Sequence, residues 1–112
     1  MGYVDTMPSI IYNKLVRDKI PDIIAESGKQ PIVEILDMKS YKAFLDAKLA
    51  EELNEYMLSD SVEELADMAE VIIAILEYKS VSHDQFDEIR NDKNNKRGKF
   101  ERRLLLKEVI SE

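Results

Sequence analysis

The chain has 112 residues, of which 35% are charged, and its formal net charge is −7. This acidic balance excludes duplex nucleic acid as a general partner, because the phosphate backbone repels a negatively charged surface. Cysteine is absent, which excludes disulfides, thiol catalysis and cysteine-ligated zinc, and a single histidine, His83, leaves little room for imidazole chemistry.

The length fits one domain, which we expect to span residues 1–112 with a flexible lead-in at 1–9. The longest apolar run, Val71 to Leu76, is far shorter than the roughly 18 residues that a membrane span needs. No basic region followed by an apolar stretch opens the chain, so we expect a cytoplasmic protein without membrane contact. Met7 is an alternative start to Met1.

The first forty residues predict short elements only. Residues 10–21 are apolar with interleaved basic groups, and Asp18 can cap a short helix that runs to Ser27 and is terminated by Gly28. The β-branched run at 31–37 favours an extended segment, which needs a partner strand to be stable.

Two long helices are expected next. Ser40 opens the first, from Tyr41 to about Leu58, whose apolar residues recur every three or four positions. Ser61 begins a capping-box pattern that opens the second, which runs to about Lys79. Because residues 71–76 are apolar nearly all round, we expect this helix to be the buried centre and to be covered by at least one further subunit.

A third helix is predicted from a second capping box, Ser82 to Gln85, with Phe86 and Ile89 facing inward. A polar, basic run follows at 91–99, and the apolar pattern of the tail at 100–112 is compatible with helix or strand. The expected fold class is therefore all-α, an antiparallel helical bundle preceded by short extended segments.

Acidic residues gather on the two long helices. Glu52 and Glu55 share a face of the first helix, as do Glu64 and Asp67 on the second, because each pair is three residues apart. Two such helices packed antiparallel would point four carboxylates into one small volume, which is repulsive unless a cation sits between them. This pattern predicts a magnesium site.

The alternative is that these acids form ordinary solvated faces, and a helix dipole favours acids such as Glu63 and Glu64 in a first turn anyway. One feature favours the metal. Glu64 falls on the same side of its helix as Met68, Val71 and Ile75, and a carboxylate that points toward an apolar core needs a partner there.

Basic residues cluster at both ends of the chain. Such clusters favour phosphate contacts, although solubilising segments have the same composition. Lys48, one turn before Glu52, can form an ordinary helix ion pair or reach a phosphate. The candidate phosphate-binding residues are Lys14, Arg17, Lys48, Lys96, Arg97 and Arg103.

Three segments resemble one family. Residues 48–55 and 64–67, KLAEELNE and ELAD, resemble the ExxE…ExxD signature of the MazG-like all-α nucleoside triphosphate pyrophosphatase superfamily. The opening YNKLVRDKIP at 12–21 and the ending KRGKFERR at 96–103 are similar to its phosphoribosyl-ATP pyrophosphohydrolase-like subgroup. The resemblance extends over about residues 11–110.

This resemblance implies a MazG-like helical bundle that assembles as a homodimer or homotetramer and uses Mg²⁺, with Mn²⁺ as a substitute. The implied activity is cleavage of the α–β phosphoanhydride of a nucleotide substrate to a monophosphate and pyrophosphate. By position, the metal ligands would be Glu52, Glu55, Glu64 and Asp67. Glu51 or Glu55 would orient or deprotonate the attacking water, and the basic residues would face the phosphates.

The segment between Glu55 and Glu64 is shorter than in many members, so the helical hairpin is tight and both one-metal and two-metal binding stay open. Two other functions also stay open. One is a non-catalytic nucleotide-binding or regulatory module on the same scaffold, and the other is hydrolysis of phosphoribosyl-ATP itself.

Overall fold

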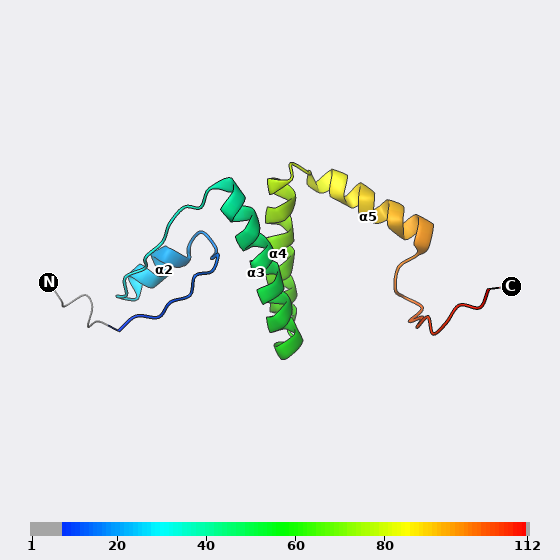
Figure 1. The fold of residues 1–112 in the computed structure, drawn as a ribbon, viewed down its shortest axis with the longest axis horizontal. Helices are drawn as coiled ribbons and strands as arrows, with labels where there is room; N and C mark the ends of the chain where they lie inside the picture. Colours follow the sequence, from blue (N-terminus) through cyan, green and yellow to red (C-terminus); the bar gives the residue numbers. More distant parts are fainter. Residues whose placement is uncertain (1–7, 112) are drawn as a thin grey trace. The chain divides into compact units, whose positions relative to one another are not determined.

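The computed structural model describes residues 8–111, and all the regular structure in this range is helical (Figure 1). The helices are α2 (Ile20–Glu26), α3 (Met38–Ser59), α4 (Val62–Tyr78) and α5 (His83–Arg97). The all-α expectation is confirmed. Most of the expected lead-in at 1–9, together with the two alternative start residues, lies outside the described residues.

The chain divides into two units, the first ending at Ile75 and the second beginning at Leu76, within the last turn of α4. Each is described below by itself. No helix in residues 8–111 has both the length and the apolar character that a membrane crossing requires.

Helix α2 is short and begins later than predicted. Lys19, not Asp18, takes the N-cap position, and its side chain makes no capping hydrogen bond. Pro21 lies in the first turn, where its missing N–H costs nothing. Gly28 adopts φ +90°, and the Lys29 N–H reaches back to the Ile24 carbonyl at 3.3 Å, so the predicted glycine stop is confirmed.

Residues 29–37 have no regular structure, so the extended segment expected at 31–37 does not form a paired β-strand. No strand elsewhere in the described chain offers its backbone a partner, and an isolated strand is not stable. Ile35 is fully exposed, whereas Pro31 and Leu36 are half-buried, so only part of the segment packs on the rest of the chain.

Helix α3 begins at Met38, three residues before the predicted start, because Asp37 and not Ser40 is its N-cap. The Asp37 carboxylate accepts a hydrogen bond from the Ser40 N–H at 2.7 Å. This bond favours the charged carboxylate and lowers the pKa of Asp37 below its usual value.

A tight turn joins α3 to α4. Asp60 adopts a left-handed conformation at φ +54°, and α4 starts at Val62 as the sequence predicts. The Ser61 N–H, which the capping-box pattern assigns to Glu64, donates instead to Ser59 Oγ at 3.3 Å. The Glu64 carboxyl is therefore available for contacts with the facing helix.

The buried apolar core is small. Leu45 of α3 is 1% exposed and Val71 of α4 is buried, while Ile72 to Leu76 are only half-buried. The expectation that α4 forms a buried centre is wrong for the single chain, since α3 is one helix and covers one side of α4 (Figure 1). Other large apolar side chains of this hairpin are exposed: Leu53, Met57, Leu58, Val62 and Leu65.

Helix α5 belongs to the second unit and begins with the predicted capping box. Ser82 Oγ accepts from the Gln85 N–H at 3.1 Å, and Gln85 Oε1 accepts from the Ser82 N–H at 2.8 Å. The helix continues to Arg97, so most of the basic run at 91–99 is helical. Phe86 is half-buried as expected, whereas Ile89 is 54% exposed and does not face inward.

The tail after α5 forms neither of the two structures that its pattern allows. Gly98 ends α5 at φ +81°, and residues 103–111 have no regular structure. Phe100 and the apolar residues of the tail are exposed, so they bury no surface that would stabilise a helix.

Candidate metal centre

Helices α3 and α4 lie side by side (Figure 1). Their facing sides bring three carboxylates together. Glu52 comes from α3, and Glu64 and Asp67 come from α4. One oxygen of each carboxylate lies within 4.8 Å of the other two. The i, i+3 spacing on α4 and the tight turn at Asp60 produce this convergence, because they place both acids of α4 opposite one face of α3.

Glu64 is the least satisfied member of this acidic cluster. Its Oε2 is buried and has no hydrogen-bond partner. Removal from water raises the pKa of Glu64 above its ordinary value, and a hydrogen bond to Glu52 and the negative charges of Glu55, Glu52 and Asp67 raise it further. Glu64 as a whole is only half-buried, but its shielded oxygen among three other acids favours a bound proton or a cation.

Glu52 is 6% exposed and is the one buried charged residue in the described chain. Lys48, one turn earlier on α3, places its Nζ 3.2 Å from Glu52 Oε1 and 3.2 Å from Glu51 Oε2. The Lys48 side chain is itself largely shielded from water. The ion pair therefore offsets part of the cost of burying Glu52. It confirms the expected helix pair of Lys48, whose role toward phosphate stays a prediction.

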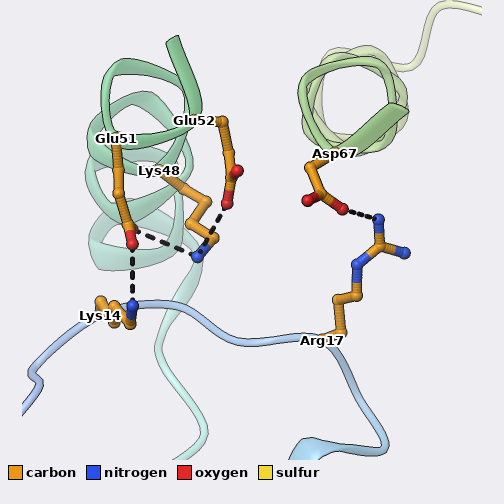
Figure 2. Close-up of polar contacts among 6 residues, drawn as sticks. All are labelled: Lys14, Arg17, Lys48, Glu51, Glu52 and Asp67. Carbon is orange, nitrogen blue, oxygen red and sulfur yellow. Dashed lines mark hydrogen bonds and ion pairs between the residues drawn. The ribbon is translucent and has the colours of Figure 1, made fainter. Parts of the chain in front are cut away.

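Residues 14–17, which form no helix, bridge α3 and α4 (Figure 2). We call them the N-terminal segment. Lys14 donates to Glu51 of α3 at 2.8 Å, and Arg17 donates to Asp67 Oδ1 of α4 at 2.7 Å. Each hydrogen bond raises the pKa of its basic partner, and the Lys14 bond also lowers the pKa of Glu51. The segment thus places one basic side chain against each of the two helices.

Sequence reasoning missed these two ion pairs, although a signal for them exists. Three residues of extended chain span about 10 Å, and packed helices have axes about 8–10 Å apart. The spacing from Lys14 to Arg17 therefore matches the distance between two packed helices. The partner acids themselves become evident only from the fold.

Glu55 lies outside the acidic cluster. It is half-buried, and it forms no hydrogen bond or ion pair with another described residue. Its charge nevertheless raises the pKa values of Glu64 and Lys14, so it is close enough to act on both electrostatically. Of the four predicted metal ligands, the structure brings three together and leaves the fourth beside them.

The donor set suits a hard divalent cation. Mg²⁺ prefers carboxylate oxygens, takes only a few from the protein and keeps several water ligands. The unpartnered Oε2 of Glu64 is an acceptor that such an ion would satisfy. Arg17 on Asp67 also shows that this cluster attracts positive charge. The residues present therefore fit a magnesium ion, with Glu52, Glu64 and Asp67 as the ligands in reach.

A cavity of about 80 Å³ lies between the N-terminal segment and α3, beside Lys14, Phe44, Lys48 and Glu51. Pockets that hold drug-sized ligands have volumes of about 300–1,000 Å³. This cavity alone is therefore too small for a nucleotide.

The remaining candidate phosphate-binding residues belong to the second unit. Lys96 pairs with Asp92 at 3.0 Å within α5, Arg97 is the last residue of that helix, and Arg103 follows at φ +55°. Their role toward phosphate stays a prediction.

Comparison with known proteins finds a curated relative over part of the chain. The chain is 46% identical over 48 residues to an uncharacterized protein of Mycolicibacterium smegmatis, over 43% of this chain and 49% of that protein. The chain thus spans about half the length of the curated relative that it matches. No family model matches the chain, and no solved structure matches it.

Proposed function

We propose that this protein is a Mg²⁺-dependent nucleotide pyrophosphohydrolase of the MazG-like helical type. The observation that carries the proposal is the convergence of Glu52, Glu64 and Asp67 within 4.8 Å around a buried, unpartnered oxygen of Glu64. Phosphoanhydride hydrolysis needs a divalent cation to offset the charge of the phosphates, and this cluster provides ligands for one.

In the proposed site, Glu52, Glu64 and Asp67 hold the cation, which lowers the pKa of water and neutralises phosphate charge when bound. Glu55, which lies next to this cluster, completes the coordination or receives the proton of the attacking water. The water oxygen bonds to the α-phosphorus, and the α–β bridging oxygen leaves with pyrophosphate. The products are a nucleoside monophosphate and pyrophosphate.

Glu55 is a better base than Glu51 in this proposal. Both oxygens of Glu51 accept hydrogen bonds, one from Lys14 at 2.8 Å and one from Lys48 at 3.2 Å. These bonds lower the pKa of Glu51, which weakens it as a proton acceptor. Glu51 instead anchors the N-terminal segment on α3.

Lys14, Arg17 and Lys48 supply positive charge at the edge of the acidic cluster, where the phosphates would lie. The small cavity beside Lys48 means that the base and ribose need further walls. We assign these walls to a homodimer or homotetramer, since α3 and α4 expose Met57, Leu58 and Val62. We propose the cytoplasm as the site of this activity, because nucleoside triphosphates are abundant there.

Product analysis tests the proposal. The full chain is incubated with Mg²⁺ and a panel of nucleoside triphosphates, deoxynucleoside triphosphates and phosphoribosyl-ATP in ¹⁸O-labelled water. We expect pyrophosphate together with a monophosphate that carries the ¹⁸O. Orthophosphate as the product would contradict α–β cleavage, and binding without turnover would identify a non-catalytic nucleotide-binding module.

Matched variants connect turnover to the site. Asp67→Asn removes the charge of a proposed ligand, whereas Asp92→Asn makes the same chemical change on the exposed face of α5. We expect Asp67→Asn to abolish turnover and Asp92→Asn to preserve it. Turnover that survives Asp67→Asn would contradict the assigned site.

A further inference from the structure

Arg17 forms an ion pair with Asp67, which is one of the carboxylates that would bind the cation. Its guanidinium donates to Asp67 Oδ1 at 2.7 Å (Figure 2). Asp67 is also a member of the acidic cluster with Glu52 and Glu64. Both the Arg17 side chain and a divalent ion would place positive charge against the same small carboxylate. Like charges at one site repel, so the two cations compete for Asp67.

The two ends of the N-terminal segment are held differently. Glu51, which pairs with Lys14, does not belong to the acidic cluster and is also held by Lys48. Cation binding at the cluster therefore leaves the Lys14 end in place. The Arg17 side chain, by contrast, is 57% exposed, and an exposed ion pair is weak enough to exchange.

We propose that Arg17 is a resident counter-ion of the cation site that is exchanged when the metal binds. In the metal-free protein it holds Asp67. On metal binding it leaves Asp67 while Lys14 keeps the segment on α3, and its guanidinium becomes available for a phosphate group of the substrate. This inference rests on the proposed function for the cation site, and it adds an order of events in which the metal precedes the arginine–phosphate contact.

The exchange predicts that removal of Arg17 strengthens cation binding. Mn²⁺ serves as the probe, because its free form is measured directly by electron paramagnetic resonance. We expect Arg17→Gln to bind Mn²⁺ roughly two- to fivefold more tightly than the wild type, which is the ratio that an exposed ion pair is worth. Arg17→Lys, which keeps a charge able to reach Asp67, should restore an affinity close to that of the wild type.

Lys19→Gln is the matched control. It removes the same charge from the same part of the chain, at the N-cap of α2, where Lys19 forms no ion pair with another described residue. We expect its Mn²⁺ affinity to equal that of the wild type at an ionic strength of about 0.15 M, which screens distant charges. Equal gains in Lys19→Gln and Arg17→Gln would show a general charge effect and overturn the exchange.

Movement of Arg17 has its own readout. In the ¹⁵N-labelled full chain, the Arg17 Nε–Hε resonance, assigned by its absence in Arg17→Gln, should shift as Mg²⁺ saturates the site. An unshifted resonance, or Mn²⁺ affinity that is unchanged or lower in Arg17→Gln, would overturn the exchange and leave the cation site intact. If the wild type binds no Mn²⁺, the cation site itself is wrong, and the proposed function fails with the exchange.

Discussion

Helix α5 and the facing sides of α3 and α4 contain the same kinds of charged residue in two different settings. On α5 the charges pair within the helix, Arg90 with Asp87 and Lys96 with Asp92, and all four side chains are exposed. On α3 and α4 the acids converge across two helices, and Glu52 is 6% exposed. Spacing along a helix therefore does not distinguish a solvated face from a site, whereas burial and unsatisfied oxygens do.

The largest expected effect comes from the packing that supports the site. Leu45 precedes Glu52 by two helical turns on the same face of α3 and is 1% exposed. We expect Leu45→Ala to lower the free energy of unfolding by about 2–5 kcal/mol, because it leaves a cavity in a small core. Urea denaturation followed by circular dichroism measures this change.

Met38→Ala is the control for that measurement, since Met38 lies on the same helix, is 62% exposed and is not among the residues assigned to the subunit contact. It should change the free energy of unfolding by less than about 0.5 kcal/mol. An equal loss in the two variants would mean that Leu45 is no better packed than the exposed Met38.

The next effect concerns Glu64, which distinguishes the acidic cluster from an ordinary acidic first turn. We expect Glu64→Gln to weaken Mn²⁺ binding at least about tenfold, because it removes the charge of a proposed ligand. Glu63→Gln alters the neighbouring acid of the same turn, which is exposed, and should bind Mn²⁺ as the wild type does. Titration calorimetry or electron paramagnetic resonance measures both. Equal affinities in Glu64→Gln and the wild type would exclude Glu64 as a ligand.

The same variant has a pH signature in the metal-free protein. The native state raises the pKa of Glu64 above 4.5, so the native state holds this proton more tightly than the unfolded state. Stability linked to Glu64 is therefore present at low pH and is lost as the pH rises through the raised pKa. We expect Glu64→Gln to melt at a higher temperature than the wild type at neutral pH, and the difference to vanish in acid.

A smaller effect is expected at the start of α5, where the stabilising contacts are local. Ser82→Ala removes the hydroxyl that accepts from the Gln85 N–H, which should cost about 1 kcal/mol. Because α5 has no buried residue, amide hydrogen exchange in its first turn should increase. Exchange in α3 serves as the internal reference and should stay unchanged.

The smallest effect is expected from the exposed ion pairs of α5. Lys96→Gln removes the partner of Asp92 in an i, i+4 pair, which is worth about 0.3–0.5 kcal/mol. Thermal denaturation at low and high salt measures the change. A loss above about 1 kcal/mol would show that α5 is not a simple solvated helix.

Local signals in the sequence predicted the helix boundaries where capping chemistry decided them. The capping box at Ser82 and the glycine stop at Gly28 are confirmed, because both depend on a few neighbouring residues. The start of α3 was misplaced because Asp37 and Ser40 are both good N-cap residues, and only backbone geometry selects Asp37.

The sequence predicted the candidate site only in part, because local spacing identifies its acids but not how the helices pack. Helical spacing placed Glu52 with Glu55 and Glu64 with Asp67, and the turn at Asp60 brings three of these four acids together. It could not place Glu55 beside the cluster rather than in it, because that depends on how far α3 is rotated relative to α4. The pairing of Arg17 with Asp67, which are 50 residues apart, depends on the tertiary fold in the same way.

The most direct test of the cation site is a crystal structure of the full chain grown with Mn²⁺, with anomalous diffraction data to locate the ion. We predict one anomalous peak bounded by Glu52, Glu64 and Asp67, with the Arg17 guanidinium displaced from Asp67. An α3–α4 hairpin that holds no ion between these acids, with Arg17 still on Asp67 at saturating Mn²⁺, would contradict the cation site.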